Sequence, residues 1–95
     1  MEKLYRQLLK IQKKPEMYFG KKSIILLSSY LNGFLDFQSR EPSNFKCSFY
    51  RFDSFVKNYY KSKAEEWVDM ILEKYDDENG FDAFYKLLIL FLNEN

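Results

Sequence analysis

The chain has 95 residues, of which 46% are hydrophobic and 31% charged, with a formal net charge of +1. This composition excludes a disordered chain, and the length predicts a single helical domain covering residues 1–95. The longest apolar run, Leu87–Leu92, is far shorter than the roughly 20 residues of a membrane span. There is no cleavable signal pattern and only one cysteine, Cys47, so we expect a cytoplasmic protein without an intramolecular disulfide and without membrane contact.

The first helix is predicted over residues 2–13, because apolar residues recur there at helical spacing. Its apolar stripe consists of Leu4, Leu8 and Ile11. Pro15 is expected to end the helix, since the residue before a proline is disfavoured in the α region. The segment 15–20 is then predicted to be a compact turn.

A second helix is predicted from Ser23, which can cap its N-terminus, to about Phe37. Its wide apolar face predicts a place at the centre of the bundle, and Gly33 suggests that a neighbouring helix approaches closely. The connection 39–50 is predicted to be a loop, although Phe45, Cys47 and Phe49 alternate with polar residues as in a strand.

Three more helices are predicted in the second half of the chain. The first is short and covers 52–59. The second covers 64–75, behind a capping box formed by Ser62 and Glu65. After an acidic turn at 76–80, the last helix is predicted over 81–92. The fold class is therefore predicted to be all-α, a compact bundle of about five helices.

Catalytic chemistry has little support in this sequence. The chain has no histidine, which removes the commonest general base and metal ligand. One cysteine cannot build a zinc site, and the three glycines form no phosphate-binding motif. Pairs of carboxylates on a polar helix face are usually solvated surface. We therefore expect a protein that is not an enzyme and that uses no metal and no cofactor.

Charge is distributed unevenly along the sequence. Residues 1–22 carry seven positive and two negative side chains, whereas residues 61–95 carry four positive and nine negative ones. Such asymmetry can steer association with a charged partner. The basic N-terminal segment leaves open a second interpretation, a small nucleic-acid-associated regulator. Apolar residues beyond the main stripe of the last helix, such as Ile89, leave open a third, a structural oligomerisation module.

The segment Lys14–Gly20 resembles an R/K-x-P-x-M-Y-L-G turn found in a family of small helical bacterial proteins. Later stretches of the chain are similar to the same family, in order. They comprise Phe52, Phe55 and Val56, then Trp67, Ile71 and Leu72, then Asp77, Glu78, Phe81, Phe84, Tyr85, Leu87 and Leu88. Phe19 stands where the family has Leu, and Phe55 where it often has Trp; both substitutions keep an apolar side chain.

Members of this family are immunity proteins of polymorphic-toxin and contact-dependent growth inhibition systems. The resemblance implies a protein that binds and neutralises the C-terminal domain of a cognate toxin. Many such toxins are nucleases, whose substrate clefts must be positive to hold phosphates. A negative surface could block such a cleft, so we expect toxin contacts from the acidic residues Glu65, Glu66, Asp69, Glu73, Asp76, Asp77 and Asp82. Tyr50 and Tyr60 are further candidates for contact with the partner.

Overall fold

The computed structural model describes residues 3–39 and 48–94, and helices make up most of this part of the chain. In order, they are α1 (Lys3–Lys13), α2 (Pro15–Phe19), α3 (Ile24–Ser39), the short 3-10 helix η1 (Ser48–Arg51), α4 (Phe52–Tyr60), α5 (Trp67–Leu72) and α6 (Asp77–Asn93). The predicted all-α bundle is confirmed. None of the helices in the described ranges is long and apolar enough to cross a lipid bilayer.

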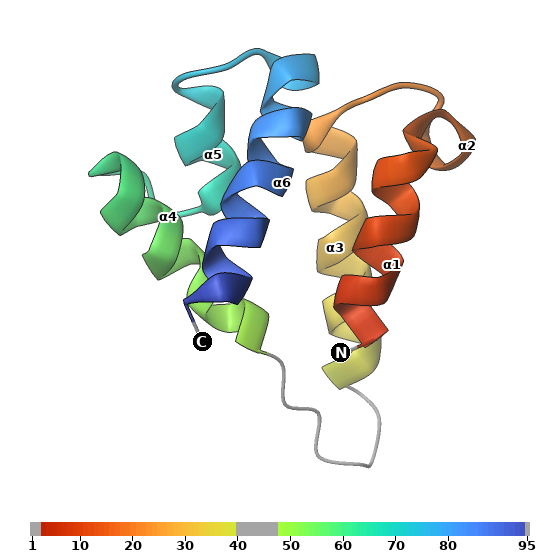
Figure 1. Ribbon diagram of the computed structural model, residues 1–95, viewed down its shortest axis with the longest axis horizontal. Helices are drawn as coiled ribbons and strands as arrows, with labels where there is room; N and C mark the ends of the chain where they lie inside the picture. The colour runs from red at the N-terminus through yellow and green to blue at the C-terminus, as the bar shows by residue number, and fades with distance from the viewer. Residues whose placement is uncertain (1–2, 40–47, 95) are drawn as a thin grey trace.

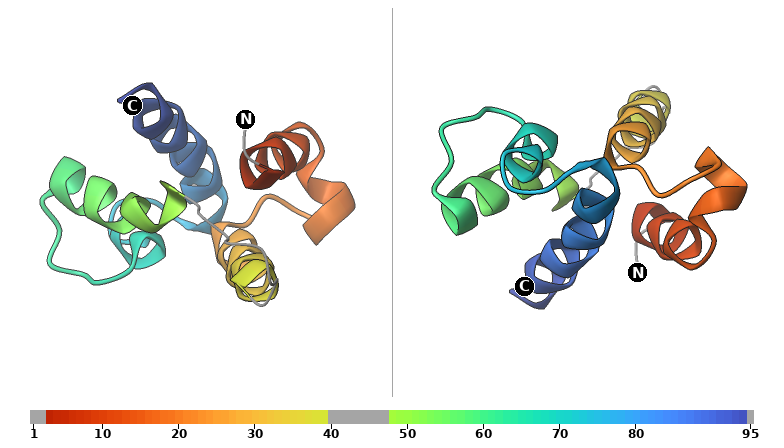
Figure 2. Two further views of the ribbon diagram at one scale, coloured as in Figure 1. Left: turned by 90° about the horizontal axis from the view of Figure 1, so that it is seen from below. Right: turned by 90° about the horizontal axis from the view of Figure 1, so that it is seen from above.

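The C-terminal helix α6 lies at the centre of the bundle and packs against α3, α4 and α5. Figures 1 and 2 show it between the α4–α5 pair and α1; α3 and α6 begin close together at the same end of the molecule and then diverge. The sequence had predicted this central position for α3. The prediction was wrong because α3 buries fewer side chains and leaves Ile25 and Phe37 exposed, whereas eight residues of α6 are buried.

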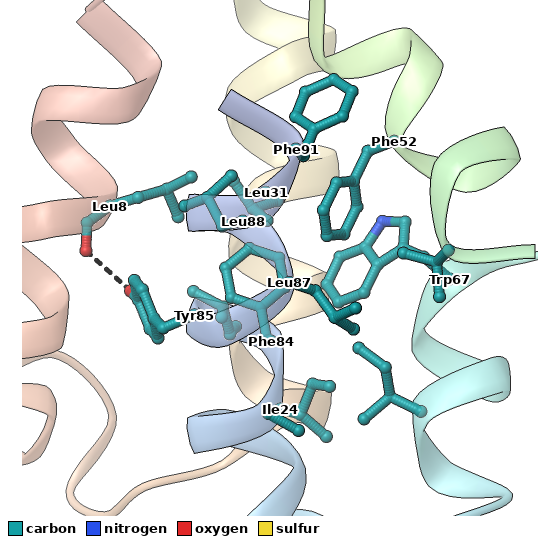
Figure 3. Packing of buried hydrophobic residues seen from close by; sticks show 14 of the residues in the cluster. Leu8, Ile24, Leu31, Phe52, Trp67, Phe84, Tyr85, Leu87, Leu88 and Phe91 are labelled. Atoms are coloured by element: carbon teal, nitrogen blue, oxygen red, sulfur yellow. Dashed lines mark hydrogen bonds between the residues drawn. The ribbon is translucent and has the colours of Figure 1, made fainter. Parts of the chain in front are cut away.

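Aromatic side chains fill the core between α4, α5 and α6. Phe52 has no exposed surface, and its ring centroid lies 5.4 Å from those of both Phe84 and Phe91 and 5.6 Å from that of Trp67. Most of these rings meet edge to face, the geometry that their quadrupoles favour. Figure 3 shows how the four side chains converge from three helices. Few residues are therefore needed to build a core in so short a chain.

A buried hydroxyl joins α1 to α6. Tyr85 donates a hydrogen bond of 2.7 Å to the main-chain carbonyl of Leu8, in the middle of α1 (Figure 3). Burial raises the pKa of Tyr85, so the phenol remains a donor at neutral pH. The bond satisfies a polar group that would otherwise be costly to bury beside the apolar stripe of α1.

The segment after α1 is a helix, so the prediction of a turn at 15–20 was wrong. Pro15 does end α1, but its fixed φ also suits the first position of a new helix, and α2 begins at this residue. Gly20 ends α2 with φ 78°, a left-handed conformation that glycine adopts without strain. Met17 and Tyr18, which lie between them, are consequently presented on one short, well-defined helical turn.

The predicted capping box at Ser62 and Glu65 does not form. The Ser62 hydroxyl accepts from the main-chain N–H of Ala64, and it donates to Glu73 at 2.6 Å. The cap of α5 comes instead from α4, where Asp53 accepts from the N–H of Trp67 at 2.8 Å. The helix therefore begins at Trp67, and residues 61–66 form a connection along the outside of α4 and α5.

The acidic segment predicted as a turn at 76–80 is instead the first turn of α6. Asp76 accepts a 2.7 Å hydrogen bond from the N–H of Asn79, which is the normal contact of an N-cap. Ser23 caps α3 as predicted, accepting from the N–H of Leu26.

The close approach of a neighbouring helix that was predicted at Gly33 is found at Gly80 instead. A Cβ on Gly33 would meet nothing, whereas one on Gly80 would lie 3.2 Å from Ile24 and 3.3 Å from Ile71.

Lys61 ends α4 in a left-handed conformation with φ 54°, which a side chain makes costly. We expect Lys61→Gly to raise the free energy of unfolding by about 0.5 kcal/mol, because relief of this strain exceeds the added entropy of the unfolded chain. Urea denaturation of both proteins measures the difference. Lys63→Gly is the matched control, and it should lower stability because Lys63 has no positive φ. A loss of stability in Lys61→Gly would contradict the assignment of strain.

Candidate functional site

The seven acidic residues predicted to meet a partner form two groups in the structure. Asp76, Asp77 and Asp82 lie where α6 begins, close to the start of α3. Glu65, Glu66, Asp69 and Glu73 follow the connection after α4 and then α5. The two groups have different surroundings, and only the second is available for a partner without disturbing helix ends.

Asp77 holds the N-terminus of α3. Its carboxylate accepts from the N–H of Ile25 at 2.9 Å and lies near the Ser23 hydroxyl and Lys21. Burial acts to raise the pKa of this carboxyl, but the hydrogen bonds from Ile25, Ser23 and Ile24 and the charge of Lys21 together lower it. The side chain therefore serves as a cap between two helices that begin side by side.

Asp82 and its neighbours bring the basic and acidic parts of the sequence together. Lys22 forms a 3.3 Å ion pair with Asp82. Beside this pair is a hollow of about 460 Å³ whose lining carries both signs of charge: Glu16, Gly20, Lys21, Lys22, Asp76, Asp77 and Glu78. The charge asymmetry visible along the sequence is thus partly neutralised at this end of the fold.

Replacing Asp77 tests its structural role. We expect Asp77→Asn to lower the free energy of unfolding by about 1 kcal/mol at pH 7. The folded pKa lies below the ordinary value of 3.8. The stabilisation is therefore complete above that value and is lost as the pH falls through the lower folded pKa. Chemical denaturation at several pH values should show that the difference in free energy of unfolding between the unchanged protein and Asp77→Asn becomes smaller in acid. Glu78→Gln is the control, and an equal loss in both variants would contradict a specific role for Asp77.

The second acidic group faces solvent. Glu66, Asp69 and Glu73 follow helical spacing and share one face of α5, and all three are exposed. Glu73 accepts from Ser62, whereas within the described residues the carboxylates of Glu66 and Asp69 have no hydrogen-bond or ion-pair partner. Exposed carboxylates of this kind are free to meet a partner. Lys61 and Lys63 border them, so this face is acidic only over α5 itself.

Three tyrosines gather where α4 ends and just after α5, a feature that the sequence predicted only in part. The rings of Tyr59 and Tyr60 lie 5.3 Å apart, and the Lys74 ammonium lies 5.2 Å from the Tyr60 ring. Burial and, to a smaller extent, the neighbouring Tyr75, to which it is hydrogen-bonded, together raise the pKa of Tyr60 to about 12. Tyr59 and Tyr75 are exposed large side chains. Tyr60 was predicted as a contact residue; the side chain of Tyr50 lies outside the described residues.

A hollow of about 550 Å³ opens on the other side of Tyr59, between α4 and the end of α6. Its lining is Arg51, Phe55, Asn58, Tyr59, Phe91 and Glu94. The three aromatic residues form the apolar part, with the rings of Phe55 and Phe91 5.5 Å apart and edge to face. Arg51 and Glu94 supply opposite charges. We call the set Tyr59, Tyr60, Tyr75, Glu65, Glu66, Asp69 and Glu73 the α4–α5 surface; the hollow, which has no lining residue from α5, is not part of it.

The structure also places residues on which the other interpretations of the sequence depend. Ile89 and Leu90 are exposed on α6, as an oligomerisation module would require. Cys47 and most of the connection predicted over 39–50 lie outside the described residues. Within residues 3–39 and 48–94, no three side chains of the metal-binding types group together. No protein family model, curated protein or solved structure matches this chain.

Proposed function

We propose that this chain is a protein-binding module, an immunity protein that neutralises a cognate bacterial toxin domain by forming a stoichiometric complex in the cytoplasm. In this role it is not an enzyme and needs no cofactor. The resemblance around Lys14–Gly20 suggests the class of partner. The α4–α5 surface is the observation that carries the proposal, because Tyr59 and Tyr75 are large exposed side chains and the exposed carboxylates of Glu66 and Asp69 have no hydrogen-bond or ion-pair partner among the described residues.

The chemistry of the α4–α5 surface suits a partner with a positive cleft. Tyrosine is enriched at protein interfaces because its ring buries large apolar area while its hydroxyl remains hydrogen-bonded. Glu66 and Asp69 would accelerate encounter with a basic surface by electrostatic steering. A basic cleft is what a nuclease toxin must present to its substrate. Blocking it requires only binding, which accounts for an inhibitor without catalytic residues.

The contribution of the two acidic groups to binding should differ. Asp76, Asp77 and Asp82 act at helix ends or in an ion pair within the fold. A partner that bound them would compete with contacts that stabilise the protein itself. We therefore assign toxin contact to Glu65, Glu66 and Asp69, with Glu73 held by Ser62 at the edge of the surface.

The proposal is tested by purifying the tagged chain from its native cells and identifying what is recovered with it by mass spectrometry. The expected result is the C-terminal domain of a large secreted toxin, present at equal molar amount with the tagged chain. Recovery of nucleic acid would support the regulator instead. Recovery of the chain alone, as a self-associated species of defined mass, would support the oligomerisation module.

A further inference from the structure

All the charged residues on the exposed face of α1 are basic. Lys3, Arg6, Lys10 and Lys13 are all exposed, and α1 contains no acidic residue. Their positions follow helical spacing, so the side chains lie along one stripe opposite the buried Leu4, Leu8 and Ile11. Like charges at such spacing repel one another and destabilise a helix slightly. The fold gives no account of why this face carries one sign of charge.

Two large apolar side chains emerge where this stripe ends. Met17 is 76% exposed, the highest fraction among the large hydrophobic residues of the described chain, and Tyr18 is 43% exposed. Neither contributes to the buried core, although their neighbour Phe19 packs against it. Together with Lys10, Lys13 and Lys14 they line a hollow of about 260 Å³. This arrangement is an apolar centre with a cationic rim.

We propose that this hollow is a second protein-binding surface, and that its occupant is an acidic protein segment with an apolar side chain flanked by carboxylates. The apolar side chain would rest on Met17 and Tyr18, while the carboxylates would meet the ammonium groups of Lys10, Lys13 and Lys14. Methionine suits such a site, because its flexible thioether adapts to partners of different shape. An apolar centre with a charged rim is the usual composition of a protein interface.

A nucleic-acid strand fits the same residues less well. Stacking platforms for bases are aromatic, whereas the most exposed side chain here is a methionine. Tyr18 is also engaged with Phe19, with ring centroids 6.3 Å apart. The net charge of the chain is only +1, so its acidic parts would repel a long polyanion that a short acidic segment could avoid.

This surface is distinct from the α4–α5 surface, to which it contributes no residue. Figures 1 and 2 show α1 and α2 on one side of α6, with α4 and α5 on the other. The two proposals can therefore fail independently. Substitutions on α1 and α2 test the second surface, and substitutions on α5 test the proposed toxin contact.

Methyl and amide NMR of the whole chain provides the test. The first probe is a peptide of two glutamates, leucine, phenylalanine and two glutamates; the second is an oligothymidylate at the same concentration. We expect the peptide to shift the Met17 methyl and the amides of Lys10 to Tyr18 saturably, with a Kd below about 1 mM. The buried Met70 methyl is the internal reference and should not move.

Two variants separate charge from apolar contact. Lys10→Glu with Lys13→Glu should weaken peptide binding at least roughly tenfold, and Met17→Ser should weaken it without changing charge. Lys57→Glu with Lys86→Glu, at exposed lysines elsewhere, is the matched control and should retain binding. The proposal is overturned by absence of peptide shifts at Met17, by shifts that survive the Lys10 and Lys13 reversal, or by larger shifts of the same residues with the oligothymidylate.

Discussion

Phe52→Ala should lower the free energy of unfolding by about 4 kcal/mol, since the substitution removes a large ring and leaves a cavity. Phe52 is fully buried and has ring contacts with Phe49, Trp67, Phe84 and Phe91, which come from η1, α5 and α6. The free energy of unfolding of a natural domain is only about 5–15 kcal/mol, so a loss of this size would leave the folded state only marginally stable.

Thermal and urea denaturation, followed by circular dichroism, measures this effect. Phe37→Ala is the matched control, because it removes the same ring from a side chain that is 64% exposed. The control should change stability by less than about 0.5 kcal/mol. Similar losses in both variants would contradict the packing of α4 against α6 around Phe52.

Reversing two charges on α5 should weaken binding of the recovered toxin domain by roughly 10- to 100-fold and should make the remaining affinity less sensitive to salt. The variant is Glu66→Lys with Asp69→Lys. These carboxylates are exposed and have no ion-pair partner among the described residues, so little of the effect should come from the fold itself. Most of the loss is expected in the association rate, because charges on the periphery act mainly through steering.

A second double reversal separates local charge from total charge. Glu16→Lys with Glu78→Lys also places lysines in the first turns of helices, and it changes net charge equally. Each substitution adds two charges, so both variants move from +1 to +5. The Glu16 and Glu78 variant should bind within about threefold of the unchanged protein. Equal losses in both variants would mean that net charge, rather than α5, governs association.

Helix positions were largely predictable from local spacing. Apolar residues that recur at helical intervals predicted the bounds of α1, α3, α4 and α6 to within a few positions. The cap at Ser23 was also predictable, because its hydrogen-bond partner Leu26 lies only three residues away. The start of α5 was not predictable in this way. Its cap is Asp53, which lies 14 residues earlier in the sequence and becomes adjacent only after folding.

The candidate site was predictable only in part, for the same reason. The sequence identified the acidic segment, but it could not show that Asp77 caps α3 or that Asp82 pairs with Lys22, which is 60 residues away. It identified Tyr60 but missed Tyr59 and Tyr75, because their association depends on how α4 packs against α5. The pair Tyr59–Tyr60 did indicate an exposed tyrosine, since adjacent residues of a helix cannot both face the core.

Titration of the recovered toxin domain with the purified chain tests the central claim most directly. Toxin activity should fall in proportion to the amount of chain added and reach zero at one molar equivalent, because a stoichiometric inhibitor is consumed by each complex it forms. Full activity in the presence of excess chain would contradict neutralisation. Loss of activity at a small fraction of an equivalent would contradict inhibition by binding and would indicate that the chain modifies its partner catalytically.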